Sequence, residues 1–316
     1  MNILEKEIIA TLAFFNTFEK ALTVEELFEN LYRENLTSAN RSEEELMNAL
    51  KSLEAGSIIE TSEREEGIAI RLKGTATKDR TEYNKKLIAK TNRWSWVFKL
   101  CPFLELVGVC NTLGFNAAKE GSDIDLFIVT GGGRLFTGRT FVTLITHMLG
   151  LRRHGNKIKE RFCLSFMVDA ADQDVHRLAF EEDVYFTYWL KNLRIVYARN
   201  TDSIEDLAAN NKYWVSQYLH NPNFNTEKVR QGKFVISKMI EFLLTGIIGN
   251  SIEKSLRTWQ LKRARRKASE LPDLSGTVLT ETTLKFHDID KRRAIHTKWQ
   301  KDKQSSHSKD HEFSTF

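Results

Sequence analysis

The sequence predicts an α+β fold with more than one domain. Three observations indicate it: helical periodicity followed by two short strands in the first 75 residues, apolar strand-like runs alternating with a helix between residues 104 and 169, and helical spacing from Phe180 to about Lys267. A chain of 316 residues, 41% hydrophobic and 28% charged, is long enough for several cores. We therefore expect domains at 1–75, 76–175 and 176–270, followed by an extension at 271–316.

Residues 1–75 predict three helices and a β-hairpin. Helical spacing begins near Ile8, Thr23 and Ser42 are suitable N-cap residues for the next two helices, and Gly56 would end the third. The run "SIIETSEREEGIAIRLKG" then predicts two strands joined by a polar turn at Glu65–Gly67. This order resembles a winged helix-turn-helix domain, whose third helix would read DNA. That helix opens with three glutamates, which would repel a duplex, so we expect the module to position a partner or a second domain; a DNA-binding regulator is the weaker alternative.

Residues 76–175 predict a small sheet with helices packed on it. A charged helix covers 78–99 and ends before Pro102. Three strands follow, "LELVGVC", "DIDLFIVT" and "RFCLSFMVD", with a helix over "RLFTGRTFVTLITHMLGL" between the second and third. The basic segment "LRRHGNKIKER" before the third strand is either a solvated loop or a contact for phosphates.

The remainder of the chain predicts helices and a polar end. Helical spacing covers "EEDVYFTYWLKNLRIVY", "NKYWVSQYL", "VRQGKFVISKMIEFLLTGIIG" and "SIEKSLRTWQLKRARRK". Residues 271–283 are turn-like, and the polar composition after Lys301 is typical of a disordered tail.

Two acidic residues stand at the mouth of the second predicted strand, in "EGSDIDLFIVT". Because side chains alternate along a strand, Asp123 and Asp125 project to one side and Ile124 to the other. Two carboxylates beside an apolar sheet repel each other unless a cation lies between them. Mg²⁺ takes one or two carboxylates and completes its octahedron with waters and substrate phosphates. The pair therefore predicts a Mg²⁺ site, with a solvent-facing strand edge as the alternative.

The surroundings of this pair carry a resemblance to a known family. An apolar strand, "LVGVC", then "NTLGFNAAKEGS" and then an apolar-flanked DxD resemble the DNA polymerase β-like nucleotidyltransferase superfamily. The segments "NAAKEGSDIDLFIVT", "GLRRHGNKIKERFCLSFMVD" and "LKFHDIDKRR" are similar to a group of bacterial nucleotidyltransferase-domain proteins, a likeness that brings no substrate with it. The resemblance implies a nucleotidyltransferase-type mixed sheet, up to two Mg²⁺ ions, and transfer of an NMP from an NTP, with ATP expected, to a hydroxyl of a protein, RNA or small-molecule acceptor.

The resemblance also implies the site residues. Asp123 and Asp125 would be catalytic and metal-binding together with a third carboxylate, which we place at Asp169 at the end of the third strand. If that strand is in register one pair earlier, Ser165 instead occupies the position where an acid is expected.

The nucleotide-binding residues depart from the family's pattern. Its Gly-Ser falls on Asn111 and Thr112, which we expect to bind nucleotide together with Ser122. Asparagine tolerates the left-handed backbone conformation, and threonine keeps a hydroxyl, but both are bulkier than the residues they replace. The alternative function is therefore a catalytically degenerate module that binds protein or nucleic acid.

Charge and cysteine usage indicate partners and compartment. Residues 1–75 hold 8 Lys or Arg and 15 Asp or Glu, a net −7, whereas 227–303 hold 18 and 9, a net +9. A polyanion such as RNA would therefore meet the basic C-terminal half. Three scattered cysteines and an N-terminus unlike a signal peptide predict a cytoplasmic protein. The apolar stretch 234–248 is too short to span a bilayer, so no membrane partner is expected.

Overall fold

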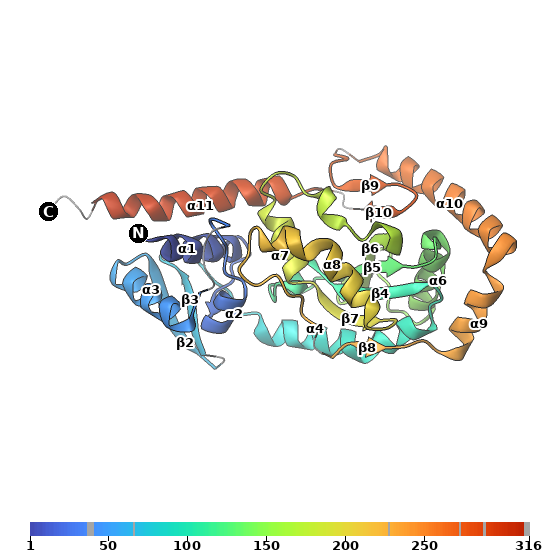
Figure 1. Ribbon diagram of the computed structural model, residues 1–316, viewed down its shortest axis with the longest axis horizontal. Coiled ribbons are helices and arrows are strands. Elements are labelled where there is room, and N and C mark those ends of the chain that lie inside the picture. The colour runs from blue at the N-terminus through green and yellow to red at the C-terminus, as the bar shows by residue number, and fades with distance from the viewer. Residues whose placement is uncertain (37–40, 66, 227, 272, 287–288, 313–316) are drawn as a thin grey trace.

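The computed structural model describes residues 1–36, 41–65, 67–226, 228–271, 273–286 and 289–312, and it shows a mixed α+β protein with two β-sheets. A small sheet lies in the N-terminal module and a seven-stranded sheet in the middle of the molecule (Figure 1). The predicted α+β class is therefore confirmed.

The N-terminal module contains the predicted helices and strands. Its elements are α1 Ile3–Asn16, β1 Leu22–Thr23, α2 Val24–Glu29, α3 Glu43–Ala55, β2 Ile59–Arg64 and β3 Gly67–Leu72. Thr23 and Ser42 are N-caps with reciprocal capping-box hydrogen bonds, and Gly56 is the C-cap of α3, as predicted. The strands are antiparallel in the order β1-β3-β2. Residue 66, in the expected turn, lies outside the described residues.

The seven-stranded sheet has the order β8-β7-β4-β5-β6-β10-β9. Its strands are β4 Leu104–Val109, β5 Ile124–Thr130, β6 Phe162–Asp169, β7 Arg194–Ala198, β8 Arg230–Gln231, β9 Thr277–Leu279 and β10 Thr283–Phe286. The pairs β5–β6 and β7–β8 are parallel, and the others are antiparallel. The three predicted strands are the central β4, β5 and β6. The expected sheet is therefore present, but it contains four more strands than the sequence predicted.

Helices cover both faces of this sheet. The remaining elements are α4 Thr81–Trp94, η1 Ser95–Leu100, α5 Asn111–Gly114, α6 Leu135–Met148, η2 Ala170–Asp172, η3 Val175–Leu178, α7 Val184–Lys191, α8 Asp202–Ser216, α9 Val235–Leu243, α10 Gly246–Ala268 and α11 Arg292–Glu312. One apolar cluster joins Phe127 and Phe166 of the sheet to α7, α8 and the N-terminal module. A second joins Ile124 and Ile128, on the opposite face, to η1, α6 and Leu261 of α10.

The N-terminal module packs directly on the sheet domain. The Phe14 ring stacks on Tyr188 of α7 with centroids 4.1 Å apart, and the Tyr188 hydroxyl donates to the carbonyl of Asn30 at 3.1 Å. Because these side chains belong to one continuous core, the first 75 residues are not a separately tethered unit.

Three sequence expectations are corrected in the C-terminal half. The helix predicted through "LKNLRIVY" ends at Lys191, and its β-branched end forms β7, which pairs with β4. The extension from 271 supplies β9 and β10 to the central sheet. The expected tail continues α11 to Glu312, with residues 313–316 outside the described part.

Contacts with α1 hold helix α11 in place. The Trp299 indole donates to the carbonyl of Ala10 at 2.8 Å, and Asn16 donates to Asp302 at 2.8 Å. Composition alone describes α11 as polar, whereas tertiary contacts to a segment almost 300 positions earlier hold it in place.

Candidate metal and nucleotide site

Asp123 and Asp125 lie together at the N-terminal end of β5. Asp123 immediately precedes the strand and Asp125 is its second residue, while Ile124 between them is fully buried on the other face. A carboxylate oxygen of each lies within 4.8 Å of the other. The predicted arrangement, two acids on one side and an isoleucine on the other, is confirmed.

Cys163 of β6 is the third member of this cluster. The parallel register pairs Asp125 with Cys163, and the thiol sulfur lies within 4.8 Å of both carboxylate oxygens. Burial, followed by the charges of Asp125 and Asp123, raises the pKa of the Cys163 thiol to about 12. At neutral pH this position therefore offers a neutral thiol rather than an anionic ligand.

Asp169 does not join the cluster. It pairs with Thr130, at the far end of β5, five residues beyond Asp125 and therefore about 17 Å along the strand. Its Oδ1 accepts from the Ala171 backbone N–H at 3.1 Å and caps η2. The expectation that Asp169 supplies the third carboxylate is wrong, because register between strands decides which residue faces the pair. The alternative position, Ser165, lies two residues beyond Cys163 on β6, where the register with β5 shifts.

Arg153 forms an ion pair with one of the two carboxylates, that of Asp123. Its Nη1 donates to Asp123 Oδ2 at 2.6 Å and lies 3.8 Å from the Cys163 sulfur. The residue belongs to the basic loop between α6 and β6, which the sequence left open as a solvated loop or a phosphate contact. The structure shows that this arginine contacts Asp123 directly.

Asn111 hydrogen-bonds the second carboxylate, that of Asp125. Its φ is 56°, the left-handed conformation that the sequence analysis anticipated for this residue. Its Oδ1 accepts from the Tyr185 hydroxyl at 3.1 Å and from the Trp189 indole N–H at 3.0 Å. With the oxygen engaged, the amide nitrogen of Asn111 is the group that hydrogen-bonds the Asp125 carboxylate.

The environment of Asp125 makes its carboxylate easier to protonate than an ordinary aspartate, although it stays largely ionised at neutral pH. Burial, and then the charge of Asp123, raise the pKa of the Asp125 carboxyl to about 6, while the hydrogen bond from Asn111 opposes the shift. The same repulsion would be relieved by a bound cation, so the donor set fits a hard divalent ion held by two carboxylates.

The two other expected nucleotide-binding residues lie beside this cluster. Thr112 follows Asn111 in the short helix α5, and its carbonyl accepts from Ala117 N–H at 2.7 Å. Ser122 precedes Asp123, and its carbonyl accepts from Glu160 N–H at 2.8 Å. Both residues are partly exposed.

Sequence reasoning missed the aromatic and sulfur members of the site. Tyr185 and Trp189 have the spacing of a helix core, and nothing local shows that their polar atoms meet Asn111. Cys163 stands in an apolar run where a thiol acts as a small hydrophobe. Only the β5–β6 register reveals its position.

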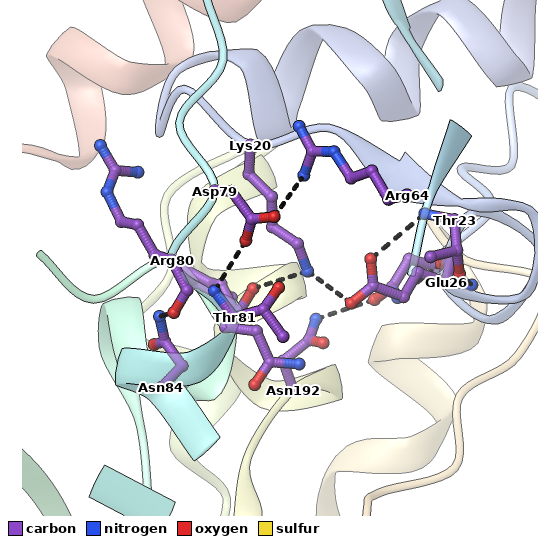
Figure 2. A network of polar contacts seen from close by, with 12 residues as sticks. Lys20, Thr23, Glu26, Arg64, Asp79, Arg80, Thr81, Asn84 and Asn192 are labelled. Carbon is purple, nitrogen blue, oxygen red and sulfur yellow. Dashed lines mark hydrogen bonds and ion pairs between the residues drawn. The ribbon is translucent and has the colours of Figure 1, made fainter. Parts of the chain in front are cut away.

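A separate basic cleft of about 340 Å³ lies between the N-terminal module and α4 (Figure 2). Its cations are largely paired with acids: Lys20 Nζ is 2.6 Å from Glu26, and Arg64 Nη1 is 3.8 Å from Asp79. Neither Asp123 nor Asp125 lines it. We place the candidate site at the carboxylates, because ligand-forming groups converge there, whereas the acids around the cleft already neutralise much of its charge.

Comparison with known proteins finds no matching family model, no matching curated protein and no matching solved structure.

Proposed function

We propose that this protein is a Mg²⁺-dependent nucleotidyltransferase that moves an NMP from an NTP, with ATP the expected donor, to a hydroxyl of an acceptor. The carrying observation is the convergence of Asp123 and Asp125 on one face of β5 beside the left-handed Asn111 at the end of β4. In this interpretation β4, β5 and β6 form a nucleotidyltransferase-type sheet, and residues 1–75 form a winged-helix-like module.

Asp123 and Asp125 would hold the metal. Two carboxylates suit Mg²⁺, which needs few protein ligands and takes its others from water and phosphates. The neutral thiol of Cys163 suits it poorly, since Mg²⁺ prefers oxygen. The donor set therefore supports one ion better than the two expected from the resemblance. When bound, Mg²⁺ supplies charge stabilisation at the phosphates and lowers the pKa of a coordinated hydroxyl.

The protein's own groups would position the reactants. Asn111 orients Asp125, and the αL turn at Asn111–Thr112 brings backbone and hydroxyl close to the carboxylates. Arg153, released from Asp123, has the fork geometry that binds phosphate oxygens. The acceptor oxygen would bond to the α-phosphorus as the bond to pyrophosphate breaks, and the acceptor proton would pass to water. Positioning and charge stabilisation then provide the rate.

The test uses the purified 316-residue protein, labelled NTPs, Mg²⁺ and a cell extract. Asp123→Asn/Asp125→Asn should abolish labelling, whereas Asp169→Asn, the same chemical change at the other end of the sheet, should retain it. MgATP should raise the melting temperature of wild type and of Asp169→Asn but not of the double variant. Equal labelling by wild type and the double variant would remove the assignment.

A catalytically degenerate binding module is the second candidate. It is favoured by two contacts: the Arg153 guanidinium already pairs with Asp123, and Cys163 stands where a third acid is expected. Calorimetric titration separates the two functions, because a degenerate site would give neither heat nor thermal stabilisation with MgATP while the protein still captured a macromolecule through its other surfaces.

A further inference from the structure

Helices α9 and α10 form an exposed apolar corner at one end of the molecule. The two helices meet at a bend of 91° and stand at the edge of the fold, away from the N-terminal module (Figure 1). Among their large apolar side chains, the most exposed are Ile247 at 85%, Phe242 at 79%, Val235 at 73%, Ile248 at 68% and Leu243 at 66%. Contiguous apolar surface of this kind is rare on a monomer and marks a contact site.

Helix α9 places polar residues inward and apolar residues outward, the reverse of an ordinary amphipathic helix packed on an apolar core. Its inward positions are polar: Ser237 is fully buried, and Glu241 accepts from the Phe103 backbone N–H at 2.6 Å. Apart from Lys238, its exposed positions are apolar and include Val235 and Phe242. Because the inward hydrogen bonds fix the rotation of α9, the apolar side cannot turn into the core without leaving Glu241 unpaired.

The first half of α10 has the same inversion. Glu253 faces the start of α6, where it accepts from the backbone N–H groups of Phe136 and Thr137, both at 2.9 Å. Ile247 and Ile248 point outward on the opposite side. In both helices, therefore, a glutamate on the inner side hydrogen-bonds the rest of the fold and leaves the apolar side chains facing outward.

The charges around the corner are cationic. Among the described residues of 234–268, both acids, Glu241 and Glu253, are engaged inward as described above. Lys238 on α9 and Lys254 on α10 are exposed, and the exposed face of α10 continues into Lys262, Arg263 and Arg266. Apolar side chains bordered by cations are complementary to an anionic lipid surface. Self-association through a two-fold contact would instead bring these like charges together.

The dimensions suit a surface contact. No single helix in the described ranges is long and apolar enough to cross a membrane, although α9 and α10 pass the same test as a bent pair. The nine residues of α9 extend only about 14 Å, less than half the thickness of a hydrocarbon core. Side chains at such a corner can reach about 5–10 Å into the boundary between headgroups and acyl chains.

We propose that the α9–α10 corner docks this protein on the surface of an anionic lipid bilayer, with Phe242 and Ile247 inserted and the exposed lysines facing the headgroups. The sequence predicted no membrane partner because the window 234–248 is short and contains Lys238 and Glu241. The structure shows instead that Glu241 faces inward, so this acid does not interrupt the apolar outer side of α9. The proposal is independent of the nucleotidyltransferase assignment.

The test is vesicle sedimentation of the full chain. Wild type should bind vesicles of 70% phosphatidylcholine and 30% phosphatidylglycerol at least ten-fold more tightly than pure phosphatidylcholine, and 0.5 M salt should weaken the binding. Phe242→Ser/Ile247→Ser should lose at least ten-fold in affinity, and Lys238→Gln/Lys254→Gln should lose the preference for the anionic vesicles. Tyr213→Ser, at a residue 76% exposed on α8, is the matched control and should bind as wild type does.

The outcomes that overturn the proposal are distinct. Failure of wild type to bind either vesicle, or equal binding by the Phe242→Ser/Ile247→Ser variant, removes the corner as a lipid contact. Light scattering that shows a dimer abolished by the same variant, without vesicle binding, assigns the corner to self-association instead. Because Phe242 and Ile247 are almost fully exposed, the variant should keep the circular dichroism and melting temperature of wild type, so loss of binding cannot be attributed to unfolding.

Discussion

Removal of the Arg153 side chain should make the carboxylate site bind Mg²⁺ more tightly. Arg153 Nη1 lies 2.6 Å from Asp123, and the two side chains are 43% and 17% exposed. An ion pair with this degree of solvation is worth about 0.5–1 kcal/mol. A divalent cation that takes Asp123 as a ligand must displace the guanidinium, so Arg153→Met should tighten Mg²⁺ binding by about two- to five-fold.

The assay is a calorimetric titration of Mg²⁺ into wild type, Arg153→Met and Arg152→Met at pH 8. Arg152→Met removes a neighbouring positive charge that makes no ion pair with Asp123, so it controls for the general loss of charge in the loop. Arg153→Met should bind Mg²⁺ more tightly than both other proteins. An affinity equal to or below that of wild type would refute the idea that Arg153 and the metal compete for the same carboxylate.

A kinetic comparison separates this competition from a second role. If the released guanidinium also binds the triphosphate, Arg153→Met should raise KM for the NTP even as Mg²⁺ affinity increases. An unchanged KM together with tighter Mg²⁺ binding would restrict Arg153 to its ion pair with Asp123.

Three further predictions concern the sheet. Cys163→Asp places a third carboxylate opposite Asp125 and should raise Mg²⁺ affinity at least ten-fold by calorimetry, since an oxygen ligand replaces a neutral thiol; unchanged affinity would contradict it. Burial lowers the pKa of Lys285 to about 8 from 10.5, so the unfolded chain binds more protons between these values and stability rises with pH there. Lys285→Met should therefore add about 3 kcal/mol to the unfolding free energy at pH 7 and little at pH 10.5, whereas an equal gain in urea unfolding at both pH values would exclude the charge as its cause. Gly108→Ala would place Cβ 2.8 Å from Leu193 Cδ1 and should cost about 1–3 kcal/mol in the same assay, which an unchanged midpoint would rule out.

Local patterns predicted the parts of the fold whose cause is local. The N-caps at Thr23 and Ser42 depend on side chains that bond the backbone three residues on, and the helix ends at Gly56; all three are confirmed. The "LRIVY" segment was wrongly predicted as helix, because over so short a run its apolar residues fit the helical and the strand period alike. Pairing with β4 decides in favour of a strand.

In the candidate site, too, some features follow from local sequence and others from tertiary structure. Alternation along one strand is enough to place Asp123 and Asp125 on a common face, and asparagine's tolerance of positive φ is enough to anticipate the turn at Asn111. The neighbour of that pair on β6 depends on how two strands slide past each other, and the structure selects Cys163 instead of Asp169.

The amino-acid sequence by itself therefore determined the α+β class, the helix ends near capping residues and the shared orientation of the two aspartates, since each follows from interactions within a few residues. Only the tertiary structure decided that Arg153 and Cys163 complete the acidic cluster, that α11 returns to α1, and that α9 turns its apolar side outward. Those outcomes depend on strand register and on hydrogen bonds between residues far apart in the chain, such as Glu241 with Phe103, which no local pattern encodes.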